Sequence, residues 1–408
     1  MTVAVAQSPA SALLSPAAIR ERCGNIAAAV TAGTSPHFHI HRDRLDDAAR
    51  RVAAVTRRRY PDLAIPYHSR WRHFEAGGHD RRAELDAALA SASVGERARA
   101  HIDLTVVSVL LDAGAGPAWG YAEPESAHRY TRSEGLGVAS FRAFMQGAFA
   151  ADKADPLRVD AAALAAFDAE KLAGLFNASD ANPLVGLDGR AALLRRLAAA
   201  LVDAREVFGT QARPGALYDT LTAHGTRTKV GAAQILRALL DAFGPIWLTG
   251  STLAGVPLGD AWKHPQAGGV GPTAGWVPFH KLSQWLTYSL LEPFEWAGAT
   301  VTGLFDLTAL PEYRNGGLLL DTGVLALRND ADAIVAWDVD SELVVEWRAL
   351  TVALLDELAP RVRALLGTPE LPLACILEGG TWAAGRELAT ELRGGAPPLA
   401  INSDGTVF

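Results

Sequence analysis

Residues with ionisable and aromatic side chains are concentrated in one apolar stretch of the chain, residues 276–327. Buried charges are costly unless they are paired or put to use, so this concentration marks a candidate site. Carboxylates beside cations and an imidazole can transfer protons and stabilise developing charge. The stretch contains His280, Lys281, Gln284, Trp285, Tyr288, Glu292, Glu295, Asp306, Glu312, Tyr313, Arg314 and Asp321.

The spacing in the first third of this stretch predicts an amphipathic helix. Its apolar face consists of Phe279, Leu282, Leu286 and Leu290. Lys281, Gln284 and Tyr288 fall three and four residues apart on another face, so their side chains can reach one point in space. Further along, Glu312 and Arg314 come just before a Gly-Gly pair at which the backbone is free to turn.

A second cluster lies in the loop GAGPAWGYAEPESAHRYTRSEGLG. Loops of this composition on a helical scaffold often carry function. Trp119 and Tyr121 supply flat ring surfaces, whereas Arg132, Ser133 and the backbone of Gly135 stand at the start of a predicted helix. A helix start exposes N–H groups and favours anions, so this position suits a phosphate.

The composition indicates an ordinary globular protein. The 408 residues are 49% hydrophobic and 20% charged, with a net charge of −7 at pH 7. A negative charge argues against binding the backbone of a nucleic acid. Cys23 and Cys375 cannot form a disulfide framework and indicate a reducing compartment. Neither a signal peptide nor an apolar run long enough to span a bilayer is evident, so we expect a cytoplasmic protein without membrane contact.

Apolar residues recur at helical spacing, which predicts a mainly α, compact fold with few short strands. Residues 1–14 are expected to form a flexible tail and residues 15–408 a single helical catalytic domain, in which a sub-domain boundary would fall near 150–180. Helices are expected over residues 16–30, 43–59, 95–112, 160–176, 215–224, 229–243, 341–366 and 378–392, and a short strand over 37–43.

Three further motifs have structural interpretations that outweigh functional ones. LVGLDGR is typical of a helix-hairpin-helix turn, and the acidic balance favours a structural turn over a DNA contact. The aromatic and basic segment IPYHSRWRHFEAGGHDR is expected to be an exposed loop rather than an anion site. His37, His39 and His41 share one strand face, but without a carboxylate or cysteine partner they indicate a solvated edge rather than a metal site.

Four separated motifs resemble the uracil catabolism protein 4 family, formerly described as a domain of unknown function. They are GAGPAWGY with TRSEGLGVASF, NPLVGLDGRAALL, PFHKLSQWLTYSLLEP and LPEYRNGGLLLD, and they cover nearly the whole chain. The resemblance implies a role in a pyrimidine-breakdown route that passes through a ribosylurea intermediate.

FHKLSQ and LTALPEYRNGG are more distantly similar to the lysine–glutamine helix and the aspartate–tyrosine–arginine turn of queuosine 5′-phosphate N-glycosylases. Those enzymes have a helical fold related to helix-hairpin-helix DNA glycosylases. Glu312 stands where that family has an aspartate, and Asn315-Gly316 replaces its valine–proline. This similarity implies cleavage of an N-ribosidic bond.

Such a cleavage passes through an oxocarbenium-like state and needs a carboxylate near C1′ and a proton donor for a poor leaving group. Glu312 and Asp306 are the candidate carboxylates, with Asp321 as a third. Lys281 and Arg314 are candidates to bind a 5′-phosphate or to keep the carboxylates ionised. Structural ion pairs between these residues are the alternative interpretation.

His280 and His264 are candidate proton donors near neutral pH. We assign catalysis to Glu312, Asp306, Lys281 and His280 on this basis. The remaining residues assigned to substrate binding are Trp119, Tyr121, Arg132, Ser133, Gln284, Trp285, Tyr288, Tyr313, Arg314, Asp321 and His264. No metal and no cofactor are assigned.

The sequence therefore predicts an N-ribosyl hydrolase acting on a ribosylurea-type molecule or its 5′-phosphate. One alternative is an amidohydrolase acting on the ureido group, which would normally require a metal cluster or an activated nucleophile that the sequence does not reveal. Another is a non-catalytic scaffold or binding protein of the same route. The expected partner is a small riboside or ribonucleotide-derived substrate, without nucleic acid; the oligomeric state is left open.

Overall fold

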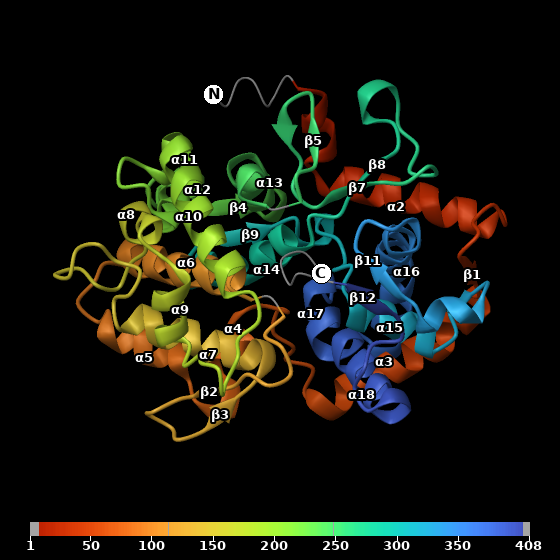
Figure 1. Cartoon of the computed structure of the whole chain (residues 1–408), viewed down its shortest axis with the longest axis horizontal. Coiled ribbons are helices and arrows are strands. Elements are labelled where there is room, and N and C mark those ends of the chain that lie inside the picture. Colours follow the sequence, from red (N-terminus) through yellow and green to blue (C-terminus); the bar gives the residue numbers. More distant parts are fainter. Residues whose placement is uncertain (1–7, 113, 248, 403–408) are drawn as a thin grey trace.

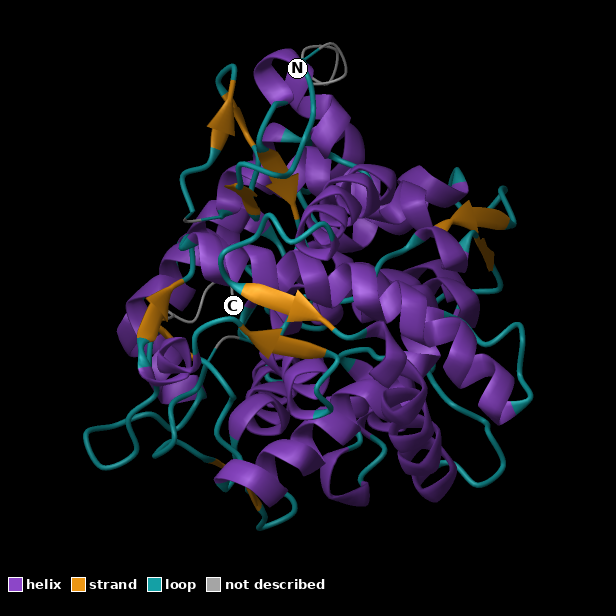
Figure 2. Cartoon of the chain, turned by 90° about the vertical axis from the view of Figure 1, so that its right-hand side faces the viewer, coloured by secondary structure: helices purple, strands orange, loops and turns teal. Residues whose placement is uncertain are grey.

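The computed structural model describes residues 8–112, 114–247 and 249–402, and helices dominate them (Figures 1 and 2). The longer helices are α2 (Pro16–Thr31), α3 (Leu45–Arg59), α6 (Val94–Leu110), α7 (Arg132–Met145), α10 (Leu187–Asp203), α13 (Ala232–Phe243), α14 (Lys281–Trp296), α16 (Glu342–Leu366) and α18 (Trp382–Arg393). The shorter ones are α4 (Trp71–Phe74), α5 (Arg81–Ala88), α8 (Ala161–Ala165), α9 (Ala169–Leu175), α11 (Arg205–Phe208), α12 (Leu217–Thr222), α15 (Tyr313–Asp321) and α17 (Leu373–Ile376). The mainly α fold class is confirmed.

The strands of the described residues form only two-stranded ribbons. Antiparallel pairs are β1 (Phe38–Ile40) with β10 (Leu325–Leu327), β2 (Tyr121–Ala122) with β3 (Arg129–Tyr130), β5 (Thr252–Leu253) with β6 (Val256–Pro257), and β7 (Ala261–Lys263) with β8 (Trp276–Pro278). Parallel pairs are β4 (Lys229–Gly231) with β9 (Thr300–Thr302), and β11 (Ala336–Asp338) with β12 (Ala400–Asn402). Three of these ribbons, β1–β10, β4–β9 and β11–β12, join segments that are far apart in the sequence.

The core is built around α6, α14 and α16. In α6 every side chain from His101 to Leu110 is buried, as expected of a helix surrounded by others. α14 packs against α6 and α13, whereas α16 packs against α2 and α3. In Figure 1, α14 therefore lies between the orange-to-green elements on the left and the blue helices on the right.

Several helix ends follow the predicted signals. The hydroxyl of Ser15 accepts a hydrogen bond from the backbone N–H of Ala18 (3.2 Å), and Pro16 opens α2. α3 begins with Asp46 and Asp47 and ends with three arginines, which matches the helix dipole. None of the helices in the described ranges is long and apolar enough to cross a bilayer.

Several expected helices are shorter than predicted, among them the one over 215–224, which is limited to Leu217–Thr222. Residues 160–176 form α8 and α9 rather than one helix, because the Asp168 carboxylate accepts a hydrogen bond from the backbone N–H of Lys171 (2.8 Å) and starts a new helix. The helix expected from residue 229 begins at Ala232, because residues 229–231 pair with β9 instead. The cap at Asp168 is a local signal that the apolar spacing outweighed, whereas the pairing with β9 is a tertiary constraint that local spacing could not reveal.

The prediction that residues 1–14 form a flexible tail is wrong for residues 9–13. Pro9–Leu13 form a 3₁₀ helix in which Ala10 and Leu13 are fully buried. Both pack in a small apolar cluster with Leu258 and Ala261, which gives this segment a hydrophobic reason to be ordered. Residues 1–7 lie outside the described residues, and the placement of a domain boundary stays a prediction.

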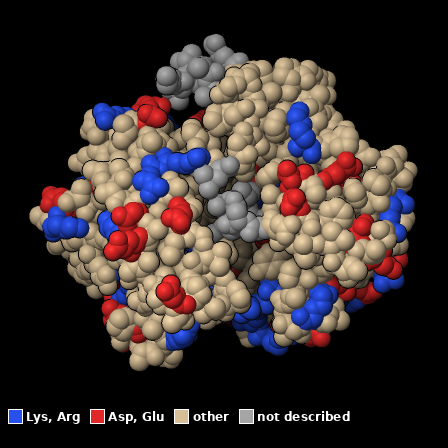
Figure 3. Space-filling view, viewed as in Figure 1, with Lys and Arg blue, Asp and Glu red and all other residues tan. Residues whose placement is uncertain are grey.

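The LVGLDGR motif forms the predicted turn at the start of α10. Gly186 has a φ of 75°, a conformation that favours glycine, and precedes the first helical residue, Leu187. Basic and acidic side chains are interspersed on the face of the molecule in Figure 3, without a continuous basic stripe. A structural relationship between this hairpin and those of DNA glycosylases stays a prediction.

Candidate active site

A cavity of about 610 Å³ lies at the start of α14. This volume is within the range of roughly 300–1,000 Å³ that is common for small-molecule sites. Segments of α4, α7, α14, α15, α18 and β12 and several connecting loops contribute to its wall. The lining residues are His68, His73, Asp112, Gly114, Ala115, Gly116, Pro117, Arg132, Ser133, Lys281, Leu282, Trp285, Leu310, Glu312, Tyr313, Arg314, Trp382, Gly395, Pro397, Leu399 and Ile401.

A buried ion pair fixes the start of α14. The carboxylate of Asp260 accepts two hydrogen bonds from the guanidinium of Arg348 (2.8 and 2.7 Å) and a third from the backbone N–H of Lys281 (2.9 Å). Burial alone would raise the pKa of Asp260, but Arg348 and these hydrogen bonds lower it to about 2. The first turn of α14 is thereby held against α16, with Lys281 and Trp285 at the cavity.

Glu312 caps α15 from the opposite wall. Its two carboxylate oxygens accept hydrogen bonds from the backbone N–H groups of Arg314 (2.7 Å) and Asn315 (2.5 Å). Burial raises the pKa of Glu312, although these two N–H groups and Lys281 act in the opposite direction. Arg314 is itself buried, donates to the carbonyl of Gly395 (3.2 Å), and is thus locked between α15 and the C-terminal segment.

Lys281 lies in the electrostatic field of two carboxylates that line the cavity, those of Glu312 and Asp112. Burial and Arg348 lower the pKa of its ammonium group to about 8, while Asp260, Glu312 and Asp112 act to raise it. An ammonium group whose pKa lies so close to neutral can serve as a cation and can also exchange protons in the same pH range.

Asp112 belongs to the third wall, which Arg70 organises. The guanidinium of Arg70 is fully buried and donates to Asp112 (3.0 Å), the hydroxyl of Ser108 (2.6 Å) and the carbonyl of Ser133 (3.2 Å). It also lies 3.3 Å from Nδ1 of His73. One side chain therefore ties α4, the end of α6 and the start of α7 together around the cavity.

The glycine-rich loop at residues 114–117 is held by the hairpin turn. The backbone N–H of Val185 donates to the carbonyl of Ala115 (3.2 Å), and Arg190 of α10 donates to the carbonyls of Leu111 (3.1 Å) and Gly114 (3.2 Å). The turn predicted as structural thus positions one edge of the cavity.

Aromatic rings form much of the remaining wall. Trp285 packs edge-on against His73 (5.8 Å between ring centroids) and lies 6.5 Å from His68, which in turn lies 6.2 Å from Trp382. The indole N–H of Trp285 is buried and has no hydrogen-bond partner among the described residues. A buried donor without a partner is costly, so a ligand oxygen would complete this site.

Seven of the residues predicted from sequence come together in this cavity. They are Lys281, Trp285, Glu312, Tyr313, Arg314, Arg132 and Ser133. The helix containing Lys281 and the turn containing Glu312 both reach this cavity, whereas Gln284 and Tyr288, expected to reach the same point as Lys281, do not line it.

The other two predicted carboxylates lie elsewhere. Asp306 is exposed in the 3₁₀ turn Leu304–Asp306, where its carbonyl accepts from Arg20 (2.6 Å). Asp321, at the end of α15, accepts from Arg393 of α18 (2.6 Å). Neither residue lines the cavity. Asp306 lies in a turn that follows α14, and Asp321 lies at the end of α15 opposite to the Glu312 cap.

The two predicted proton donors also lie outside the cavity. The buried ring of His280 donates through Nε2 to the carbonyl of Leu13 (3.1 Å), and burial lowers its pKa. His264 is buried with Nε2 3.4 Å from the carboxylate of Glu346. Both imidazoles serve the packing of the N-terminal segment and α16 instead.

Four predicted binding residues are part of the core. Gln284 and Tyr288 both bond to Thr308 (2.9 and 2.7 Å), so the polar face of α14 mainly secures the segment before α15. The indole N–H of Trp119 donates to the carbonyl of Phe176 (3.0 Å). Tyr121 is buried in β2, and burial raises its pKa to about 12.

The structure adds His68, His73, Asp112 and Trp382 to the site. The segment that contains both histidines was expected to be an exposed loop. This prediction is wrong, because Arg70 and Trp71 are buried. Asp112 had a usable signal: it follows the C-terminal end of α6, where a negative charge is unfavourable without a partner. No group of three or more His, Cys, Asp or Glu side chains suited to a metal occurs among the described residues.

Comparison with known proteins places the chain in a family. Residues 12–408 match the family model described as "Protein of unknown function (DUF1688)", and the chain belongs to this family. It is 38% identical to "Uracil catabolism protein 4" of Lachancea kluyveri over 92% of this chain and 93% of that protein. It is 40% identical to "Protein urg3" of Schizosaccharomyces pombe over 84% of each chain. The family resemblance predicted from the four motifs is confirmed.

Proposed function

We propose that this protein acts in uracil catabolism and hydrolyses the N-glycosidic bond of a ribosylurea-type molecule. Support for the pathway comes from the name of the relative in Lachancea kluyveri. Support for the chemistry comes from one observation: a sugar-sized cavity in which the Glu312 carboxylate, the Lys281 ammonium and aromatic rings face a common space.

Glu312 supplies the negative charge that an oxocarbenium-like state requires. Its raised pKa makes it a stronger base than an exposed glutamate, so it can also take a proton from the attacking water. Asp112 is the second carboxylate at the cavity and forms an ion pair with Arg70 (3.0 Å). Lys281 lies in the field of both and limits their mutual repulsion.

The cationic side of the cavity suits a 5′-phosphate. Arg132 and Ser133 open the 14-residue helix α7, whose first N–H groups favour an anion. Arg314 lines the same cavity, and its Nε–H is buried without a hydrogen-bond partner among the described residues. The ring of Tyr313 and the indole of Trp285 provide flat walls for the ribose and ureido groups.

Incubation of the purified protein with ribosylurea and with ribosylurea 5′-phosphate tests this function. Release of free urea together with ribose or ribose 5-phosphate is expected. Release of ammonia from an intact N-glycoside would instead support an amidohydrolase. If neither substrate is consumed while both bind, a non-catalytic binding protein would be the better description.

A further inference from the structure

The proposed reaction needs a proton donor, because urea is a poor leaving group. His280 and His264 contact Leu13 and Glu346 outside the cavity and do not fill this role. His68 does line the cavity. We propose that His68, oriented by Glu378, is the acid that protonates the departing nitrogen; this inference rests on the proposed function.

Glu378 determines which nitrogen of His68 exchanges protons. Its carboxylate lies 2.8 Å from Nδ1 of His68 and also accepts from Arg59 (2.9 Å) and the hydroxyl of Tyr60 (3.1 Å). Burial would raise the pKa of Glu378, but the hydrogen bonds from His68 and Arg59 hold it below its ordinary value. An anionic acceptor keeps a proton on Nδ1, so Nε2 is the atom that gains and loses one.

A π-helical turn, Leu377–Thr381, places Glu378 at this position. A Cβ on Gly380 would lie 2.5 Å from Oγ1 of Thr56 and 2.6 Å from Cγ1 of Val52, so a glycine is required for the turn to sit on α3. Arg59, at the end of α3, donates to Glu378 from the same side. Such turns are frequent at functional sites because they redirect side chains that a regular helix would place elsewhere.

The second cavity histidine, His73, is held in one tautomer. Nδ1 of His73 lies 3.3 Å from the guanidinium of Arg70, which can only donate. Burial, followed by Arg70, lowers the pKa of His73 well below its ordinary value, so the ring is neutral with its proton on Nε2. His73 is therefore a fixed hydrogen-bond donor. The titratable groups in the field of His68 are Glu378, Glu312 and His73.

The step balances with water as the only co-reactant. The C1′–N bond breaks, its electron pair goes to the nitrogen, and that nitrogen takes the proton from Nε2 of His68, so urea leaves neutral. Water adds to C1′ and loses one proton to Glu312. That proton returns through solvent to His68, which restores both residues.

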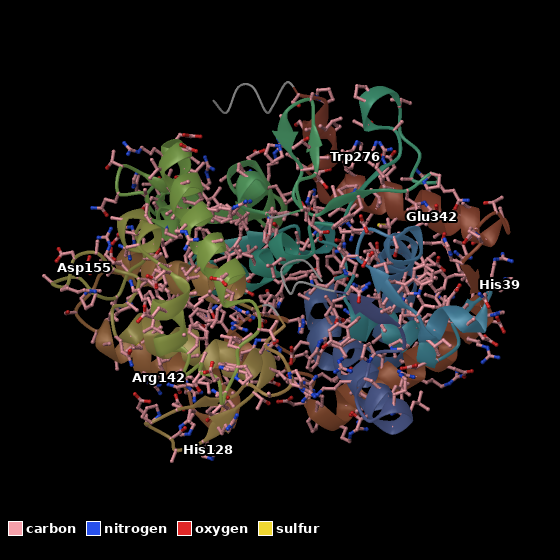
Figure 4. The ribbon with its side chains drawn as sticks, in the orientation of Figure 1. His39, His128, Arg142, Asp155, Trp276 and Glu342 are labelled. Carbon is pink, nitrogen blue, oxygen red and sulfur yellow. The ribbon has the colours of Figure 1, made fainter. Side chains whose placement is uncertain are left out.

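A change of leaving group separates this role from a structural one. We expect His68→Gln to lower kcat on ribosylurea by at least about a hundredfold, the scale of a lost general acid. On 4-nitrophenyl ribofuranoside, whose leaving group needs no proton, the same variant should stay within about tenfold of wild type. His39→Gln is the matched control, because His39 is exposed in β1 at the right-hand edge of the molecule in Figure 4.

Equal losses on both substrates, or no loss on ribosylurea, would overturn the role of His68 while leaving the hydrolase intact. Wild-type protein that releases no urea would overturn both proposals. For Glu378→Gln, we expect kcat on ribosylurea to fall while turnover of 4-nitrophenyl ribofuranoside stays near wild type, because the variant loses the carboxylate that orients His68. Equal effects on both substrates, or none on ribosylurea, would remove Glu378 from the mechanism.

Discussion

At the scale of single residues, Glu312 combines a structural role with a proposed chemical one. Two backbone N–H groups occupy one acceptor site on each carboxylate oxygen. A carboxylate has about four such sites, so the others remain for a water or a developing cation. The same helix cap that orders α15 therefore orients the proposed catalytic group.

The substitution Glu312→Gln separates the helix-capping role from the proposed catalytic role. The amide keeps an oxygen that can accept one backbone N–H, so we expect the free energy of unfolding to fall by no more than about 1 kcal/mol. Turnover of ribosylurea should fall at least about a hundredfold, because the negative charge at C1′ is lost. Urea release and chemical denaturation measure the two effects, and near-normal turnover would remove Glu312 from the mechanism.

Lys281 should make stability depend on pH. Its pKa is lowered from 10.5 to about 8 in the folded protein, so between these values the unfolded chain binds more protons at this residue. The unfavourable contribution of Lys281 is therefore complete below about pH 8 and disappears as the pH rises towards 10.5.

Guanidinium denaturation of wild type and Lys281→Met tests this. The wild type should gain stability relative to the variant between about pH 7 and about pH 10. A stability difference that is the same at both pH values would show that the ammonium is not desolvated in the folded state.

At the scale of secondary-structure elements, close helix packing aims the charged groups. α18 lies directly on the start of α15, and a Cβ on Gly385 would fall 2.1 Å from the carbonyl oxygen of Arg314. Only a glycine at this position lets the cap formed by Glu312 approach the cavity at its present depth.

Gly385→Ala should therefore displace α15 outward. We expect a loss of about 1–3 kcal/mol in the free energy of unfolding, as for other overpacked positions, together with a lower kcat/KM for ribosylurea. Gly174→Ala in α9 is the control, since a Cβ there meets nothing within 4 Å. Equal behaviour of the two variants in thermal denaturation and turnover would contradict the proposed packing constraint.

At the scale of the whole molecule, the charge distribution argues against nucleic acid as a ligand. The net charge is −7, and the face in Figure 3 carries both signs interspersed. We expect binding to labelled duplex DNA weaker than about 10⁻⁴ M at physiological salt, measured by fluorescence anisotropy. Tighter, salt-sensitive binding would favour a repair-type function for the LVGLDGR hairpin.

The helices were predictable because their signals are local. Ser15-Pro16, the acidic and basic ends of α3, and the periodicity of α14 depend on neighbours within one or two turns. The strand at residues 229–231 was not predictable, because pairing with the distant β9 overrides local spacing. The same distinction holds for the site, where Lys281 and Glu312 stood out in the sequence but His68 did not.

By itself, the sequence determined the mainly α class, the family, and seven residues of the cavity, because composition, motif order and helical spacing are properties of adjacent residues. Only the tertiary structure decided that Asp306, Asp321, His280 and His264 lie elsewhere and that His68, with Glu378 behind it, lines the cavity. The reason is physical: residues 68 and 378 meet through tertiary contacts, in which the backbone N–H of His68 donates to the carbonyl of Ala374 (3.0 Å) and its ring reaches the π-helical turn, and no local pattern encodes these contacts.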